Sequence, residues 1–129
     1  MSIFVKIING ELPSYKISEN NNFLAFLDIS PLKKGHVLVI PKVEIDKFYD
    51  LTDDYLKEWM VFAKPIAKAI EKTFDCKRCG MTIIGLEVPH AHMHLMPISG
   101  INDMDFQQEK LKLSDKEMKD VQEKIIQNL

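Results

Sequence analysis

The chain has 129 residues, of which 46% are hydrophobic and 28% charged, and its formal net charge is −2. This length suits one domain with a hydrophobic core, so we expect residues 1–129 to fold as a single unit. The absence of a basic excess disfavours nucleic acid as a partner, and no apolar run reaches the length of about 18 residues that a membrane span requires.

The first 41 residues predict one helix and three strands. Apolar residues recur on one face of residues 3–9, which is typical of a short helix. Residues 15–19 and 23–29 are plausible strands, and the run of asparagines at 20–22 between them indicates a hairpin. Residues 36–41 are nearly all apolar, which predicts a central strand that is covered on both faces.

A long helix is predicted next. Thr52 precedes two acidic residues, a pattern typical of a helix start, and apolar side chains then recur at helical spacing to about Phe74. Pro65 lies inside this stretch, where a proline should kink the helix or displace one hydrogen bond.

The last third of the chain completes the predicted fold. Two strands, at residues 81–86 and 90–98, are close enough in sequence to pair in an antiparallel manner. Ser114-x-x-Glu117 has the spacing of a capping box, which predicts a final helix. The predicted fold class is therefore α+β, with a mainly antiparallel five-stranded sheet, one long helix and short terminal helices. We expect the helices to lie on one side of the sheet.

The N-terminal residues show no basic segment followed by a long apolar stretch, the pattern of a signal peptide. We therefore expect a cytoplasmic protein, in which Cys76 and Cys79 remain reduced thiols. A zinc site at this Cys-x-x-Cys pair has weak support, because no second pair of ligands lies near it in the sequence.

Three of the four histidines occupy alternate positions, His90, His92 and His94. In a strand, alternate side chains share one face, so this stretch would present a row of imidazoles on one side and apolar residues on the other. An unpaired polar group in a core costs about 1–3 kcal/mol. A purely structural role for three adjacent imidazoles is therefore disfavoured.

Two kinds of chemistry suit this row. Imidazole is a common metal ligand, although three histidines in a row span too far for one tetrahedral ion, and a further ligand such as His36 or Glu87 would be needed. Alternatively, one imidazole can attack phosphorus or carbon while a neighbour orients it or donates a proton to the leaving group.

The row also carries a family resemblance. His90-Ala91-His92-Met93-His94-Leu95-Met96 matches the His-φ-His-φ-His-φ-φ signature, φ being apolar, of the histidine triad (HIT) family of nucleotide hydrolases and transferases. Three more blocks agree in order, and they are Ile3-Phe4-x-Lys6-Ile7-Ile8-x-Gly10-Glu11-Leu12-Pro13, Phe23-Leu24-Ala25-Phe26-x-Asp28-Ile29-x-Pro31 and Gly35-His36-x-Leu38-Val39-Ile40-Pro41-Lys42. The similarity covers about residues 3–98 and extends to the family's nucleoside phosphoramidases.

The resemblance implies a role for each histidine. His92 would attack the α-phosphate of a nucleotide and form a covalent nucleotidyl-histidine, which water then hydrolyses. His94 would contact the phosphate, His90 would orient the site through its hydrogen bonds, and His36 would complete the pocket. The chemistry would need no metal and no cofactor.

The resemblance also implies a nucleoside site. Asp28 would accept hydrogen bonds from the ribose hydroxyls, a role that suits a carboxylate because it only accepts. The slot for the base would be apolar, formed by Ile3, Phe4, Ile7, Phe26 and Ile29. Without the family resemblance, Asp28 could equally be a turn residue at the end of a strand, and the apolar residues could belong to the hydrophobic core.

Two departures from the family pattern bear on the chemistry. Some members hold zinc through two N-terminal cysteines and two histidines, and three of those positions here are Ser2, Val5 and Glu44. We therefore expect no metal at that place. The loop before the histidines is also shorter than in well-studied phosphoramidases, and it brings Gly85 and Glu87 toward the substrate. Glu87 stands where a phosphate-facing hydroxyl would be, and a carboxylate beside a phosphate is repulsive.

The predicted function is hydrolysis of purine nucleoside 5′-phosphates with a substituted α-phosphate, adenosine 5′-phosphoramidate being an example. The alternatives are a dinucleoside polyphosphate hydrolase, a metal-dependent hydrolase that uses the histidine row, and a nucleotide-binding interaction protein with little turnover. Family members usually pair through the long helix and an adjacent strand, so the resemblance implies a homodimer.

Overall fold

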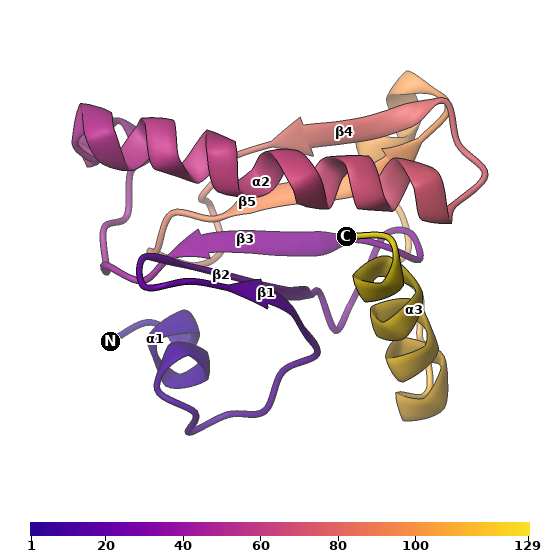
Figure 1. The fold of residues 1–129 in the computed structure, drawn as a ribbon, viewed down its shortest axis with the longest axis horizontal. Coiled ribbons are helices and arrows are strands. Elements are labelled where there is room, and N and C mark those ends of the chain that lie inside the picture. The colour runs from indigo at the N-terminus through magenta and orange to yellow at the C-terminus, as the bar shows by residue number, and fades with distance from the viewer.

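Five strands, each antiparallel to its neighbours, form one sheet in a computed structural model that describes all residues from Met1 to Leu129 (Figure 1). The strand order is β1-β2-β3-β5-β4. The bounds are β1 Lys16–Glu19, β2 Phe23–Leu27, β3 Val37–Pro41, β4 Arg78–Thr82 and β5 Met93–Ile98. The predicted α+β class, the β1–β2 hairpin and the antiparallel pairing of the last two strands are confirmed.

Strand β3 lies at the centre of the sheet and is buried along its whole length, as its apolar sequence predicts. Its alternate residues enter two separate cores. Val37 and Val39 belong to the large core, whereas Leu38 and Ile40 belong to a smaller one on the opposite face. Both faces of the sheet must therefore be covered.

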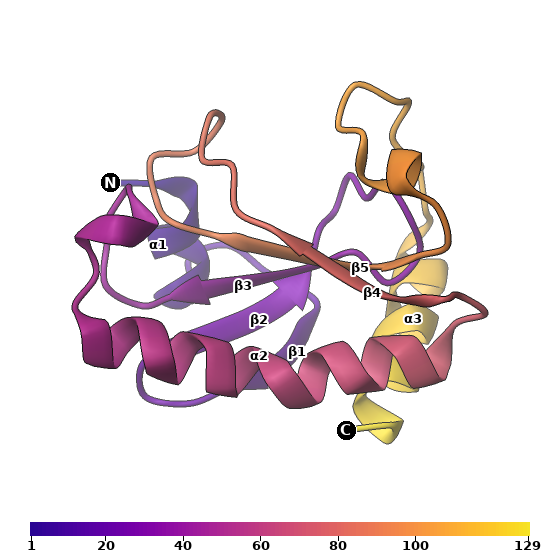
Figure 2. The same ribbon diagram turned by 90° about the horizontal axis from the view of Figure 1, so that it is seen from above.

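Helices cover both faces, so the prediction that they lie on one side is wrong (Figure 2). The long helix α2, Asp53–Thr73, packs on one face through residues such as Trp59 and Ile66. The short helix α1, Ile3–Ile8, covers the other face and buries Phe4 against β2 and β3. The final helix α3, Asp115–Gln127, packs against α2 and β1.

Helices α2 and α3 begin at the capping residues that the sequence predicts. The Thr52 side chain accepts a hydrogen bond from the backbone of Tyr55 and caps α2, which then runs through Pro65. Ser114 and Glu117 form the predicted capping box of α3. None of these helices is both long and apolar enough to cross a membrane.

The strands around the histidines differ from the prediction. Strand β4 ends at Thr82 rather than beginning near Met81, and β5 begins only at Met93, so His90 and His92 lie in the preceding loop. The backbone explains this, because Ala91 donates to the Ile45 carbonyl at 2.7 Å instead of to a neighbouring strand. A strand is lost where its backbone groups find partners outside the sheet.

Candidate active site

All four histidines meet on the face of the sheet that α1 covers, and all are buried. His94 lies on β5, His90 and His92 lie just before that strand, and His36 lies just before β3. The ring centroids of His92 and His94 are 5.0 Å apart, and those of His36 and His94 are 5.2 Å apart. The fold thus brings the distant His36 beside the local row.

The hydrogen bonds of His36 and His94 determine where their protons lie. The backbone N–H of Leu32 donates to Nδ1 of His36 at 3.1 Å, so the proton of His36 is on Nε2. That proton is donated to Nδ1 of His94 at 2.9 Å. His94 must then carry its own proton on Nε2, where it has no protein partner.

His92 and His90 are fixed in the same way by carbonyl groups, which only accept. Nδ1 of His92 donates to the backbone carbonyl of His90 at 2.7 Å, which leaves a lone pair on Nε2. Nε2 of His90 donates to the carbonyl of Pro41 at 2.8 Å, and Nδ1 accepts from the Ser2 hydroxyl at 2.9 Å. The site therefore offers one nucleophilic nitrogen, on His92, and one N–H donor, on His94.

Both of these free nitrogens are accessible. No polar side-chain atom that is fully buried lacks a hydrogen-bond partner. Nε2 of His92 and Nε2 of His94 have no partner in the protein, so both must reach the open pocket that the two side chains line. A ligand in this pocket can meet a lone pair and a proton side by side.

Burial keeps the inner imidazoles neutral. It lowers the pKa of His36 to about 4, with a smaller contribution from the Lys110 cation. It also lowers the pKa of His94 to about 3, aided by His36, His92 and Lys110. The pKa of His90 is lowered by burial as well. These three histidines are uncharged at neutral pH, which preserves the tautomers described above.

Asp28 lies at the end of β2 beside the histidine pair. One carboxylate oxygen accepts from the backbone N–H of Ser30 at 2.9 Å, and the other is 3.6 Å from Nε2 of His36. Burial raises the pKa of Asp28, while the Ser30 N–H and the Lys110 cation oppose that rise. The second oxygen remains available as an acceptor for ligand hydroxyls.

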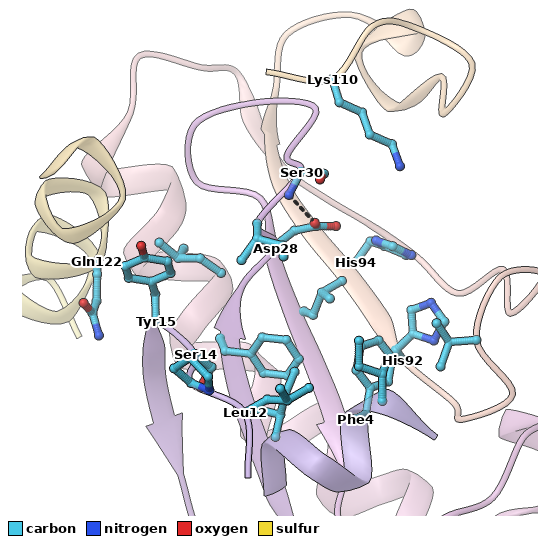
Figure 3. A pocket seen from close by; sticks show the side chains of 18 of the residues that line it. Phe4, Leu12, Ser14, Tyr15, Asp28, Ser30, His92, His94, Lys110 and Gln122 are labelled. Carbon is cyan, nitrogen blue, oxygen red and sulfur yellow. Dashed lines mark hydrogen bonds between the residues drawn. The ribbon is translucent and has the colours of Figure 1, made fainter. Parts of the chain in front are cut away.

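A pocket of about 890 Å³ opens in front of these groups (Figure 3). Nine residues that the sequence predicts for the site line it, and they are Ile3, Phe4, Ile7, Phe26, Asp28, Ile29, Glu87, His92 and His94. His36 and His90 lie behind the pocket wall and act through their hydrogen bonds. Gly85 does not line the pocket; it adopts a positive φ of 80° in the loop after β4.

Phe4 is the residue of α1 that joins the apolar slot to the histidines. Its ring meets His92 edge to face, with centroids 5.1 Å apart, and contacts Phe26 at 5.8 Å. The Ser2 side chain caps α1 by accepting from the Val5 backbone, so the helix start and His90 share one hydroxyl. The position of α1 is thereby tied to the histidine row.

Several residues of the site were not predicted. Phe106, in the loop after β5, packs its ring on His94 with centroids 4.6 Å apart, and Lys110 of the same loop lines the pocket. The far end of the pocket comes from the segment before β1 and from α3, through Leu12, Pro13, Ser14, Tyr15, Asp115, Lys119 and Gln122. No local pattern marks these residues, because tertiary packing brings them to the site.

Two places in the structure gather groups of the kind that bind metal ions. Donor atoms of Asp28, His36 and His94 lie within 4.8 Å of one another. However, the proton of His36 Nε2 is shared with the lone pair of His94 Nδ1, so neither nitrogen is free to coordinate. At the place where the family resemblance locates zinc, Ser2 donates its backbone N–H to Glu44 at 2.8 Å and its hydroxyl to His90, so the donors there bind one another.

Comparisons with known proteins find relatives that match most of the chain. The HIT domain model matches residues 9–100. The chain is 42% identical over 108 residues to "Protein hit" of Bacillus subtilis, covering 78% of this chain and 73% of that protein. It is 43% identical over 96 residues to adenosine 5′-monophosphoramidase HNT1 of Saccharomyces cerevisiae, covering 74% of this chain but only 61% of the yeast protein. The crystal structure of a Hit-like protein involved in cell-cycle regulation from Bartonella henselae superposes with a TM-score of 0.85 at 27% identity, covering 99% and 96% of the two chains.

Proposed function

This chain belongs to the HIT domain family, and we propose that it is a nucleotide hydrolase that cleaves substituted 5′-phosphates of purine nucleosides, adenosine 5′-phosphoramidate being the first candidate. The observation that carries this proposal is the pair of accessible nitrogens, a lone pair on His92 and an N–H on His94, beside the Asp28 carboxylate. The name of the yeast relative supports the choice of a phosphoramidate.

The nucleoside part would bind in the apolar end of the pocket. Phe4 and Phe26 form the floor of a slot suited to a planar base, and Ile3 and Ile29 are exposed at its rim. The free oxygen of Asp28 would accept from the ribose hydroxyls. This arrangement would direct the 5′-phosphate toward His92 and His94.

The reaction would proceed in two steps, transfer of the nucleotidyl group to His92 and its hydrolysis. The lone pair on Nε2 of His92 forms a bond to phosphorus as the bond from phosphorus to the amine nitrogen breaks, and the departing amine takes the proton from Nε2 of His94. Water then attacks phosphorus, the bond to His92 breaks, and a proton of the water returns to His94. The products are the amine and the nucleoside 5′-monophosphate.

The neighbouring groups stabilise the intermediate of this scheme. The nucleotidyl-imidazole of His92 carries positive charge, and its Nδ1–H keeps its 2.7 Å bond to the His90 carbonyl. Once His94 has given its only proton to the leaving group it is an imidazolate, and the N–H of His36, which it accepts on Nδ1, stabilises that negative charge until water returns a proton. His90 would hold the backbone of this segment in place through its bonds to Pro41 and Ser2.

Turnover of a fluorogenic adenosine phosphoramidate by the wild type and by His92→Ala tests the proposal. Loss of the nucleophile should lower kcat by at least about 10³-fold, while AMP binding by calorimetry should persist because the slot and Asp28 remain. Intact-mass analysis of the wild type quenched during turnover should reveal an added nucleotidyl group. Equal rates for the two proteins would refute hydrolysis, and AMP binding without turnover would favour the non-enzymatic binding protein.

A homodimer is the assembly we propose, formed through α2 and β4. Met60 and Val61 on α2 and Met81 on β4 are exposed apolar residues that line one shallow hollow. Strand β4 is also an edge of the sheet, with backbone groups on one side that no strand of this chain uses (Figure 1). An exposed apolar patch beside a free strand edge is typical of an interface.

Light scattering after size exclusion tests this assembly. The wild type should have twice the 14.9 kDa mass of the chain. The double variant Val61→Glu, Met81→Glu should be a monomer, because it places charges in the interface. Ile126→Glu, at an exposed apolar residue of α3, is the matched control and should remain a dimer. A monomeric wild type would refute the proposal.

A further inference from the structure

We infer that Lys110, on the loop between β5 and α3, binds the α-phosphate group of the nucleotide; this inference rests on the proposed function. Two lysines line the pocket. Lys119 is paired with Asp115 at 3.2 Å, at the far end, whereas Lys110 takes part in no ion pair of the structure. It is the one cation of the pocket that is free to meet an anion.

The charges of the pocket require such a cation. Its lining includes the carboxylates Asp28 and Glu87, while the pKa values of His36 and His94 keep those imidazoles neutral at pH 7. A nucleotide phosphate entering this region brings a further negative charge. Without Lys110 it would meet these two carboxylates beside the neutral imidazole of His94, an arrangement that Coulomb repulsion disfavours.

Lys110 lines the same pocket as Asp28 and His94. Its charge opposes the rise that burial causes in the pKa of Asp28, and it helps to lower the pKa values of His36 and His94. Figure 3 shows its side chain reaching from the loop toward the region where Asp28 and His94 lie. It forms no ion pair with Asp28, although both side chains line the same pocket, so its ammonium remains available to a phosphate oxygen.

The loop that carries Lys110 is attached to the sheet. The backbone N–H of Leu111 donates to the Pro31 carbonyl at 2.8 Å, and Asp103 pairs with Lys33 at 3.4 Å. The Phe106 ring between these two attachments packs on His94. Both attachments join the loop to the turn that follows Asp28, so the position of Lys110 is coupled to that of the carboxylate.

This placement defines the class of ligand. A cation at the phosphate position discriminates a nucleotide from the matching nucleoside, since only the nucleotide carries the anion that it recognises. The apolar slot, by contrast, contributes equally to both ligands. Lys110 is thus a specificity-determining residue for the charge on the α-phosphate.

Binding of AMP and of adenosine to the wild type and to Lys110→Gln, measured by calorimetry, tests this inference. Lys110→Gln should weaken AMP binding about tenfold, the loss typical of a charge-assisted contact, and should leave adenosine binding unchanged. Lys110→Arg should keep most of the AMP affinity. Lys112→Gln is the matched control, because Lys112 is an exposed cation of the same loop that does not line the pocket.

The outcomes separate this inference from the proposed function. Unchanged AMP affinity in Lys110→Gln, or an equal loss for AMP and adenosine, would overturn the role of Lys110. A wild type that binds AMP through Lys110 but hydrolyses no phosphoramidate would overturn the proposed function and leave the role of Lys110 standing. A wild type that binds neither ligand would overturn both.

Discussion

Lowering the pH from 7 to 5 should destabilise this fold through His36 and His94. Burial lowers their pKa values to about 4 and about 3, whereas an unfolded chain has histidines with a pKa near 6.5. Below pH 6.5 the unfolded state therefore binds protons that the folded state does not. The free energy of unfolding consequently decreases as the pH is lowered, until the pH reaches the pKa of the folded state. Linkage gives a loss of about 2 kcal/mol for either histidine between pH 7 and pH 5.

Urea unfolding at pH 7, 6 and 5 measures this loss. Trp59, the only tryptophan, is buried against the sheet, so its fluorescence reports the transition. His36→Gln removes one titrating group, and the difference in unfolding free energy between pH 7 and pH 5 should shrink by about 2 kcal/mol. His94→Gln provides a second test should the first variant fold poorly. The reasoning would be refuted if both variants kept the full pH dependence of the wild type.

Three further predictions concern stability and are checked by the same urea titration at pH 7. Ser2→Ala should cost about 1–3 kcal/mol, because it leaves the buried Nδ1 of His90 without its donor and removes the α1 cap, and Ser2→Thr should restore most of the loss. Gly35→Ala should cost more than about 2 kcal/mol, because φ is +94° and the added Cβ would overlap the Phe74 ring; Gly10→Ala, at φ +79° in open space, should cost only about 1 kcal/mol. Thr52→Ala should cost about 1 kcal/mol through the lost cap of α2, with no effect on AMP binding.

The sequence predicts much of the fold because many of its signals are local. The caps at Thr52 and Ser114 and the apolar run of β3 each indicate their element within a few residues. Strand β4 is different, since its residues Arg78–Thr82 include little that is apolar and the strand exists because it pairs with β5. Such pairing depends on contacts that no local pattern contains.

The placement of the helices shows a second limit. The apolar pattern of β2 indicates that both of its faces are buried, but it does not say which helix covers which face. Residues 3–9 predict a helix with an apolar side, and only the tertiary structure places that side opposite α2 (Figure 2). The location of the protein in the cytoplasm is a separate prediction, which the fold does not test.

The candidate site also contains residues that the sequence identifies and residues that only the fold reveals. The three histidines at alternate positions could be identified from the sequence because they lie in one short motif, and Asp28 could be identified through the family resemblance. Phe106 and Lys110 could not, since the loop that carries them has no periodicity and reaches the site through its attachments to Pro31 and Lys33. Residues that act by position alone are found only when the fold is known.

The backbone at the two ends of β3 sets the chemistry of the site. His36, which receives the Leu32 N–H, precedes the strand, and the Pro41 carbonyl that binds His90 ends it. Backbone groups at these two ends therefore fix the tautomers of His36 and His90, while the His90 carbonyl fixes that of His92. Because these imidazoles are neutral, they supply direction but no net charge, and the charge that an anionic substrate requires must come from another part of the chain. Lys110 meets that requirement from a loop attached to the turn before β3.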